Sequence, residues 1–279
     1  MTPSPGERPL VFKVPFPDST AKSNREMQRH RLKKDFDYLV NPNKKRSYNR
    51  KLFSIVAKKY DLITPILSWG WDRVWKKKLV SNLPALLRGT ILDLACGTGD
   101  ITAALAKNYS QSMIVGVDLT HEMLKIARDM CSFSNVHFVR QDMNDVGIKD
   151  KSVDIVTGGY ALRNAPDFDQ TLCEIFRVLK PGGRAFFLDF SKSHRGGLQK
   201  LGYVILKVWG STWGILFHKN PDIYGYIAES LRTYPDRRTL KKKVLSHGFT
   251  DFNSSTFFLG LIEMFDFKKQ ANPCEETSR

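Results

Sequence analysis

Short apolar runs alternate with amphipathic segments through the middle of the chain. Nearly continuous apolar runs of five to seven residues occupy 90–95, 113–118, 136–140, 153–157 and 184–190. Apolar residues recur at helical spacing in 100–107, 121–130 and 169–179. Continuous apolar strands that alternate with helices are typical of a parallel sheet covered by helices on both faces. The pattern therefore predicts a Rossmann-like α/β fold with a mostly parallel sheet.

The C-terminal part of the pattern is different. Residues 237–247 predict a basic helix, and the segments 252–256 and 259–267 predict two strands. The two strands follow one another closely, with Gly260 near their junction, which is typical of an antiparallel hairpin. We expect this hairpin to extend the edge of the parallel sheet.

Charge divides the chain into three regions. Residues 1–51 hold 13 basic and 5 acidic side chains, which is +8 of the total +16. We interpret 1–51 as a basic, mostly flexible arm with one short helix over 23–37, 52–269 as the folded domain, and 270–279 as a tail. The favoured interpretation of the arm is a solvated tail. The alternative is a tether to anionic lipid or nucleic acid, in which each basic residue near an anionic surface adds ~1 kcal/mol of binding free energy.

Cysteine spacing and hydropathy narrow the class of protein. The four cysteines form no C-x-x-C and no metal-like pattern, so a disulfide scaffold and a zinc module are excluded and no metal is expected. The N-terminus has no secretory signal, and no 18-residue apolar stretch predicts a spanning helix. We expect a protein of the cytoplasm or an organelle matrix, soluble or peripherally bound to a membrane.

A glycine loop follows the first strand. Asp93 lies in the strand, Gly97 and Gly99 lie in the loop, and a helix begins at Asp100. Glycine lets the backbone approach a ligand closely. Asp118 ends the next strand, 19 positions after Gly99. An acid at this place accepts hydrogen bonds from the hydroxyls of a ribose. The loop therefore predicts a nucleoside-containing cofactor.

The residues around the loop indicate which cofactor. A dinucleotide fingerprint requires a third glycine or alanine, but Thr102 stands at that position. Asp93 and Asp100 flank the loop, and their negative charge suits an ammonium and a sulfonium rather than a pyrophosphate. The predicted cofactor is S-adenosylmethionine. Asp142, after the third strand, is expected to accept the adenine amino group, the alternative being an ordinary loop Asp, and Met143 offers an apolar wall.

One long apolar segment, 198–217, has two interpretations. Its glycines at 202, 210 and 214 interrupt the apolar run, and glycine weakens helices. The segment is either a pair of core helices or part of a lid over about 195–235 that holds an isoprenoid tail and touches the bilayer.

Further motifs accompany the glycine loop. They are Phe53-Ser54, Ala57, Lys59-Tyr60-Asp61, Leu67-Ser68-Trp69-Gly70, Arg73-Val74-Trp75-Lys76, Ala161-Leu162-Arg163-Asn164, Arg177-Val178-Leu179-Lys180-Pro181-Gly182-Gly183, Asp189-Phe190-Ser191-Lys192, Tyr226-Ile227-Ala228-Glu229-Ser230-Leu231, Pro235-Asp236 and Thr239-Leu240. Together they resemble the class I methyltransferases of ubiquinone and menaquinone biosynthesis over about 52–269. The segments around Tyr60, Arg163 and Tyr226 are the specific ones, whereas the Lys180–Gly183 turn is common to many methyltransferases.

The resemblance implies S-adenosylmethionine-dependent methylation of a ring carbon in a prenylated quinol precursor. It implies cofactor contacts at Thr98, Asp118, Asp142 and Met143. The full set expected to bind the cofactor is Asp93, Gly97, Thr98, Gly99, Asp118, Leu119, Asp142, Met143 and Gly159. Three features depart from the family pattern. Gly159 replaces a frequent serine, and Glu263-Met264 with 265–268 occupy the stretch of a His-Arg pair and a terminal tyrosine-lysine-phenylalanine. The arm 1–51 is longer than the short family N-terminus.

Ring methylation needs a stabilised phenolate, and three residues are expected to act on it. Arg163 stays protonated and can hold an oxyanion or a water that receives the proton, and Asn164 can orient the same group. The alternative for Arg163 is a salt bridge to Asp167 or Asp169. Tyr60 either hydrogen-bonds the ring or cofactor, or is a packed lid aromatic. Of the histidines, His218 is the one to test as a base.

Other functions were weighed against this one. An O- or N-methyltransferase of another small aromatic or lipid-like molecule is the main alternative. The pI of 9.7 and the lysine clusters at 76–78 and 241–243 favour a methyltransferase that acts on RNA. Residues 158–161, however, lack the motif of enzymes that methylate the exocyclic amines of bases. The expected partners are a lipophilic quinone precursor, an anionic membrane surface, and a homo-oligomer or quinone-biosynthesis complex, with no nucleic acid.

Overall fold

A computed structural model describes residues 37–193 and 196–271. Within these ranges seven strands form one sheet in the order β3-β2-β1-β4-β5-β7-β6. The strands are β1 (Thr90–Leu94), β2 (Met113–Asp118), β3 (Val136–Arg140), β4 (Val153–Gly159), β5 (Leu179–Phe190), β6 (Phe249–Phe257) and β7 (Ile262–Lys269). Strands β1 to β5 are parallel, and β7 runs antiparallel to both β5 and β6. The predicted sheet and its C-terminal hairpin are confirmed.

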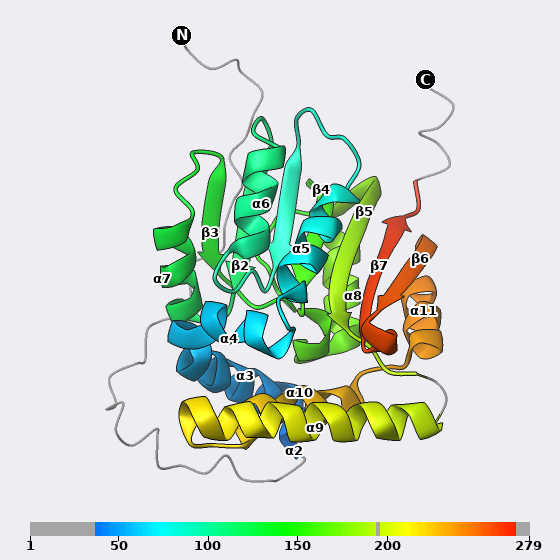
Figure 1. Ribbon diagram of the computed structural model, residues 1–279. Coiled ribbons are helices and arrows are strands. Elements are labelled where there is room, and N and C mark those ends of the chain that lie inside the picture. Colours follow the sequence, from blue (N-terminus) through cyan, green and yellow to red (C-terminus); the bar gives the residue numbers. More distant parts are fainter. Residues whose placement is uncertain (1–36, 194–195, 272–279) are drawn as a thin grey trace.

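Helices cover the sheet on both faces and also lie across its lower end (Figure 1). The helices are α2 (Asp37–Val40), α3 (Pro42–Val56), α4 (Tyr60–Leu67), α5 (Trp71–Ser81), α6 (Asp100–Asn108), α7 (His121–Met130), α8 (Phe168–Val178), α9 (Gly196–His218), α10 (Asp222–Thr233) and α11 (Arg237–Ser246), with short turns η1 (Ala57–Lys59), η2 (Leu162–Asn164) and η3 (Phe258–Gly260). The group α2–α4, α9 and α10 lies across the end of the sheet at which the parallel strands finish (Figure 1).

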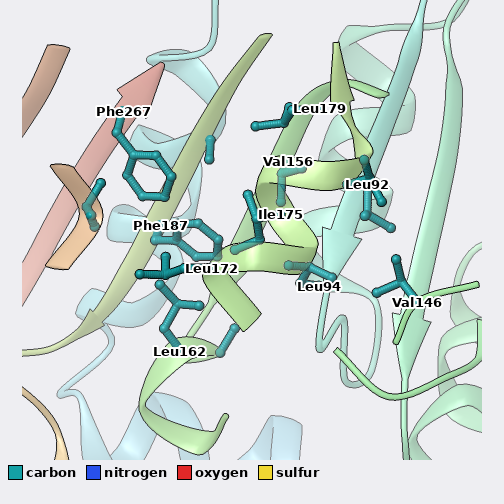
Figure 2. Close-up of a cluster of buried hydrophobic side chains, with 14 of the residues drawn as sticks. Leu92, Leu94, Val146, Val156, Leu162, Leu172, Ile175, Leu179, Phe187 and Phe267 are labelled. Carbon is teal, nitrogen blue, oxygen red and sulfur yellow. The ribbon is translucent and has the colours of Figure 1, made fainter. Parts of the chain in front are cut away.

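The central strands β1, β2 and β4 are largely apolar because each of their two faces packs against helices. Leu92 and Leu94 of β1 belong to a buried cluster with Ile175 of α8 (Figure 2). Ile91, which directly precedes Leu92, belongs to a second cluster that includes Leu105 of α6. Successive strand residues point to opposite faces, so both sets are buried and no alternation with polar residues appears.

The predicted domain boundary at residue 52 is wrong for residues 37–51. These residues form α2 and most of α3. The side chain of Asn41 caps α3 by accepting from the backbone N–H groups of Asn43 and Lys44, both at 3.1 Å, and Pro42 opens the helix. Lys45 and Asn49 are buried, which a solvated arm would not show. The rest of the predicted arm, its helix over 23–36 and the tail after residue 271 lie outside the described residues.

The segment 198–217 lies within one uninterrupted helix, α9, so the interpretation as a helix pair is wrong. Two of its glycines permit close packing against the following segment and do not interrupt the helix. A Cβ atom at Gly210 would collide with the backbone of Tyr224, and one at Gly214 would collide with that of Asn220. The glycines therefore let α10 approach α9 closely. No helix of the described residues is long and apolar enough to cross a membrane.

Candidate active site

Three cavities adjoin one another where β1, β2 and β4 end. The first, the Asp118 cavity, is lined by Gly97, Asp118, Asp142 and Met143 among others. The second, the Lys76 cavity, lies on the other side of the glycine loop and is lined by Lys76, Asp93, Thr98 and Asp100 among others. The third, the apolar cavity, has a volume of about 550 Å³ and lies between α3, α4, α9, α10 and η3. Tyr60 and Tyr160 line all three.

The glycine loop holds Asp118 in place. Gly97 and Gly99 have φ angles of +56° and +89°, a region that side chains rarely allow. The backbone N–H of Gly97 donates to Asp118 Oδ2 at 3.0 Å, and that of Thr120 donates to Oδ1 at 2.8 Å. Burial raises the pKa of Asp118, against these hydrogen bonds. Asp118 and the adjacent Leu119 both line the Asp118 cavity.

Asp93 is a buried carboxylate behind the loop. Its side chain accepts from the hydroxyl of Thr102 at 2.6 Å and from that of Thr157 at 2.9 Å. Burial raises the pKa of Asp93 to about 6. The loop residue Thr98 donates its hydroxyl to Asp61 at 2.6 Å. Asp93 and Asp61 therefore accept from neutral hydroxyl donors, so their charge remains available to a cation.

Gly159 lies between the Asp118 and Lys76 cavities. A Cβ atom at this position would lie 2.5 Å from Cδ1 of Ile101. The contact is with the end of a flexible side chain, which can move at little cost. A side chain at position 159 would therefore require Ile101 to adopt another rotamer.

Asp142 is joined to α3. Its Oδ1 accepts from the backbone N–H of Asn144 at 2.9 Å, and its Oδ2 pairs with Nε of Arg46. Arg46 lies in the segment that the sequence pattern assigned to the arm, so this contact was missed. Met143 lines the Asp118 cavity beside Asp142, as expected from the sequence.

Arg163 is buried at the edge of the apolar cavity. Its side chain is 4% exposed, and its Nε lies 3.5 Å from Asp189 Oδ1. Its guanidinium also donates to the hydroxyl of Ser230 and lies 5.1 Å from the ring centroid of Phe190. Asp189 replaces the predicted salt-bridge partners, which is a correction. Asp167 instead caps α8, and Asp169 pairs with Lys243.

Two hydrogen bonds from α3 hold the backbone of η2. Lys45 Nζ donates to the carbonyl of Arg163 at 3.2 Å, and Asn49 Nδ2 donates to that of Asn164 at 2.6 Å. The hydroxyl of Tyr226 donates to Asn49 Oδ1 at 2.7 Å. Burial, with the nearby charge of Arg163, lowers the pKa of Lys45 to about 8. Helices α3 and α10 thus set the position of η2 from both sides.

Asn164 faces two cavities, because it lines both the Asp118 cavity and the apolar cavity. Its Nδ2 donates to the carbonyl of Tyr160 at 2.8 Å. Its Oδ1 is buried and has no hydrogen-bond partner among the described residues. A buried acceptor of this kind is costly unless a ligand or water satisfies it. Asn164 is therefore placed to accept a hydrogen bond at the junction of the cavities.

Two tyrosines surround the same junction. Burial raises the pKa of Tyr60 to about 12, so its hydroxyl stays protonated at neutral pH. Tyr160 has a φ of +56°, which is uncommon for a residue with a bulky side chain. Its pKa is also raised, mainly by burial and then by the charge of Asp72. Sequence reasoning missed Tyr160, although it directly follows the two glycines that end β4.

His218, singled out as a possible base, lies elsewhere. Its Nε2 is 3.0 Å from the hydroxyl of Tyr224, and burial lowers its pKa. It is absent from the residues that line the three cavities in the described part of the chain. Its geometry gives it no direct access to a ligand in them.

Comparison with known proteins places the chain in a family. A model of the ubiE/COQ5 methyltransferase family matches residues 41–266. The chain belongs to this family. The matched range begins within the N-cap of α3, in agreement with the folded boundary in the structure.

Curated relatives match over most of their length. The chain is 35% identical to the ubiquinone/menaquinone biosynthesis C-methyltransferase UbiE of Serratia proteamaculans, over 84% of this chain and 96% of the relative. It is 34% identical to UbiE of Idiomarina loihiensis, over 82% of this chain and 94% of the relative.

Solved structures share the fold. A putative methyltransferase in complex with the Haloferax volcanii Trm112 activator has a TM-score of 0.59 at 18% identity, covering 78% of this chain and 97% of that one. Phosphoethanolamine N-methyltransferase 2 of Haemonchus contortus, in complex with S-adenosylhomocysteine, has a TM-score of 0.57 at 14% identity, covering 80% of this chain and 60% of that one. The protein is an S-adenosylmethionine-dependent methyltransferase with the class I fold.

The residues of the site fit this cofactor. Gly97 lines two of the cavities, and a Cβ there would project into open space, whereas Gly99 lines none of the three and instead allows close packing against Ala127. Carboxylates line the cavities on both sides of the loop, where Asp118 suits a ribose and Asp93 with Asp100 suits an ammonium and a sulfonium. The residues expected from the sequence to bind the cofactor therefore lie together, and their individual roles stay predictions.

Proposed function

We propose that this enzyme methylates a ring carbon of a prenylated quinol precursor in the biosynthesis of ubiquinone, menaquinone or a related quinone. The observation that carries the proposal is the apolar cavity of about 550 Å³, which meets the Asp118 cavity at Tyr60, Tyr160 and Asn164. An aromatic ring at this junction would contact polar groups, while an apolar tail would extend into the large cavity. The names of the UbiE relatives support the same chemistry.

Arg163 and Asn164 are the proposed catalytic residues. S-adenosylmethionine, when bound, supplies an electrophilic methyl group, and a phenolate makes the ring carbon nucleophilic. The guanidinium of Arg163 lines the apolar cavity and remains charged, so it stabilises a ring oxyanion or holds the water that receives the ring proton. Asn164 and the protonated hydroxyl of Tyr60 orient the ring between the two cavities. Positioning of this kind contributes roughly 7–11 kcal/mol when well arranged.

Exposed apolar side chains surround the apolar cavity and support a membrane partner. Trp69, Val208 and Phe258 line the cavity and are nevertheless 69%, 61% and 48% exposed, and Leu259 beside them is fully exposed. They come from three separate segments, the α4–α5 junction, α9 and η3. Exposed apolar surface gathered in one place marks an interaction site.

The charges near this apolar surface favour an anionic bilayer. Arg73, Lys77 and Lys78 are exposed on α5, while the acid in that helix, Asp72, is 1% exposed. The sequence of α9 contains no Asp or Glu. We propose that α9 and η3 rest on the lipid surface, so that the prenyl tail enters the cavity without crossing water.

A vesicle experiment tests the membrane contact. Leu259→Ser and Val208→Ser should weaken co-sedimentation with vesicles of phosphatidylcholine and phosphatidylglycerol. Leu87→Ser is the matched control, because Leu87 is 89% exposed but lies between α5 and β1, outside this surface. Equal binding of all three variants and the wild type would refute the contact.

A transfer assay tests the reaction. Methyl-labelled S-adenosylmethionine should label a demethylated prenyl quinol, and NMR of the product should place the methyl group on carbon. Label on oxygen or nitrogen would favour the alternative small-molecule methyltransferase, and label on total RNA would favour a nucleic-acid substrate. The expected location in the cytoplasm or an organelle matrix, and the expected oligomer or complex, remain predictions.

A further inference from the structure

The Lys76 cavity has an uneven set of charges. Among the described residues that line it, Asp93 and Asp100 carry carboxylates, and Lys76 is the only Lys or Arg. The side chain of Lys76 is 13% exposed, and its Nζ lies 2.9 Å from Asp72 Oδ2 and 3.1 Å from Asp100 Oδ2. A single, partly buried lysine therefore lies among the acids of the described lining of this cavity.

Lys76 is fixed by helix α5. Asp72 lies one helical turn before it and is 1% exposed, so the pair forms an internal contact within α5. Burial by itself would lower the pKa of Lys76, but the electrostatic interactions with Asp72, Tyr60 and Asp100 together outweigh burial and keep the pKa above its usual value. An ammonium has three N–H donors. Its contacts with Asp72 and Asp100 use two of them, which leaves one for a ligand in the cavity.

The chemistry of the cofactor favours a hydrogen-bond donor for a carboxylate on this side. The Asp118 cavity lies on the ribose side of the glycine loop, so the Lys76 cavity corresponds to the methionine end. That end carries an ammonium, a sulfonium and a carboxylate. Asp93 and Asp100 suit the first two, but they would repel the carboxylate.

We propose that Lys76 binds the α-carboxylate of S-adenosylmethionine, with Asp72 and Asp100 holding its ammonium in position. Among the described residues that line the Asp118 cavity, Arg50 is the only Lys or Arg; it lies on the opposite side of the loop and is exposed. Lys76 thereby selects a cofactor with an intact amino-acid end. The competing arrangement is capture of the carboxylate by backbone N–H groups where α6 begins, which would leave Lys76 as a structural partner of Asp72.

Decarboxylated S-adenosylmethionine separates these two arrangements, because it keeps the ammonium and the sulfonium and lacks only the carboxylate. Calorimetric titration should show that Lys76→Met weakens binding of S-adenosylmethionine about 10- to 100-fold, the scale for losing a hydrogen bond between charged groups. The same variant should bind the decarboxylated analogue within about threefold of the wild type. Lys77→Met is the control, because Lys77 is an exposed neighbour on α5, and it should bind both compounds like the wild type.

Three results would overturn the proposal. They are unchanged affinity of Lys76→Met for S-adenosylmethionine, equal weakening for both compounds, and equal preference of the wild type for the two. Since Lys76→Met leaves Asp72 buried without its partner, the double variant Asp72→Asn/Lys76→Met removes both charges and should show the same selective loss while it stays folded. The inference rests on cofactor binding, which the wild-type titration tests by itself.

Discussion

The two halves of the active site are built in different ways. In the cofactor half, Asp93, Gly97 and Asp118 come from two adjacent strands and the loop between β1 and α6. In the acceptor half, Lys45 contacts Arg163 across 118 positions of sequence, and Tyr226 contacts Asn49 across 177. The first half is therefore set by local backbone geometry, and the second by contacts between distant helices.

The difference also appears in how each half treats charge. Asp93 and Asp118 are held by hydroxyl and backbone N–H donors, which leaves their charge for a cationic cofactor. Arg163 is matched by a buried carboxylate, Asp189, whose pKa is raised by burial although the charge of Arg163 opposes the shift. The acceptor half thus keeps a buried cation with its own counter-ion. The predictions below test whether the two halves can be altered independently.

The largest expected effect is in the acceptor half. Arg163→Met should lower turnover per folded molecule about 10²–10³-fold, the scale for losing one oxyanion donor, while cofactor affinity stays within about threefold. It should also lower the free energy of unfolding by about 3–5 kcal/mol, because Asp189 is left buried without its cation. Turnover should be normalised to the folded fraction from circular dichroism.

Two further measurements complete the Arg163 test. Arg163→Lys should be intermediate, because lysine lacks the planar fork. A higher pH, toward the pKa of the substrate phenol, should partly restore the Met variant. Normal turnover of the folded Arg163→Met fraction at every pH would remove Arg163 from the mechanism.

A pH series on Asp93 probes the cofactor half. Its pKa of about 6 in the folded chain exceeds its usual value of 3.8, so the folded state binds the proton more tightly than the unfolded state. The wild type should therefore lose stability as the pH rises from about 4 to about 6, by up to about 3 kcal/mol from this group. Chemical denaturation of the cofactor-free protein measures the change.

Asp93→Asn is the matched variant for this series. It keeps an acceptor for one of the two threonine hydroxyls and presents an N–H donor to the other, but it cannot ionise. The stability difference between Asp93→Asn and the wild type should grow in favour of Asn over the same pH range. A constant difference across that range would show that Asp93 titrates normally.

Asp118→Ala should separate cofactor binding from turnover. It removes the carboxylate that we expect to accept hydrogen bonds from the ribose hydroxyls. Losing these bonds should reduce the binding free energy of the cofactor by about 1.5–3 kcal/mol, or roughly 10- to 150-fold in affinity. Turnover at saturating cofactor should change much less. Calorimetry that shows unchanged affinity for S-adenosylmethionine would contradict the assignment of Asp118.

The smallest expected effect is at the contact that links the halves. Asn49 lines the Asp118 cavity and also bonds the carbonyl of Asn164. Asn49→Leu leaves that carbonyl and the hydroxyl of Tyr226 without their partner, so the free energy of unfolding should fall by about 1–3 kcal/mol.

Turnover should fall with Asn49→Leu as well, because η2 loses a support. Tyr226→Phe is the control, since it removes one of the two contacts of Asn49 and leaves the bond to Asn164. If Asn49→Leu and Tyr226→Phe have equal turnover, α3 does not position η2 through Asn49.

Predictability from sequence followed the same division. The order of strands and helices, the glycine loop and the position of Asp118 were predicted correctly, because each depends on local periodicity or on glycine φ angles. The role of α3 was missed, because Lys45, Arg46 and Asn49 resemble the charged residues of a solvated arm. The glycines of α9 were misread as interruptions, since only the neighbouring α10 reveals that they permit close packing.

The sequence by itself determined the α/β fold and the cofactor loop, because apolar periodicity and glycine placement act over a few residues. Its motifs carried the resemblance to the methyltransferase family. Only the tertiary structure decided which carboxylate pairs with Arg163, which residues hold η2, and that Lys76 stands as a cation among the acids of its cavity. A polar side chain looks the same in sequence whether it is solvated or buried. Its partners, and hence its charge state and its role, are set by segments that packing brings together from far along the chain.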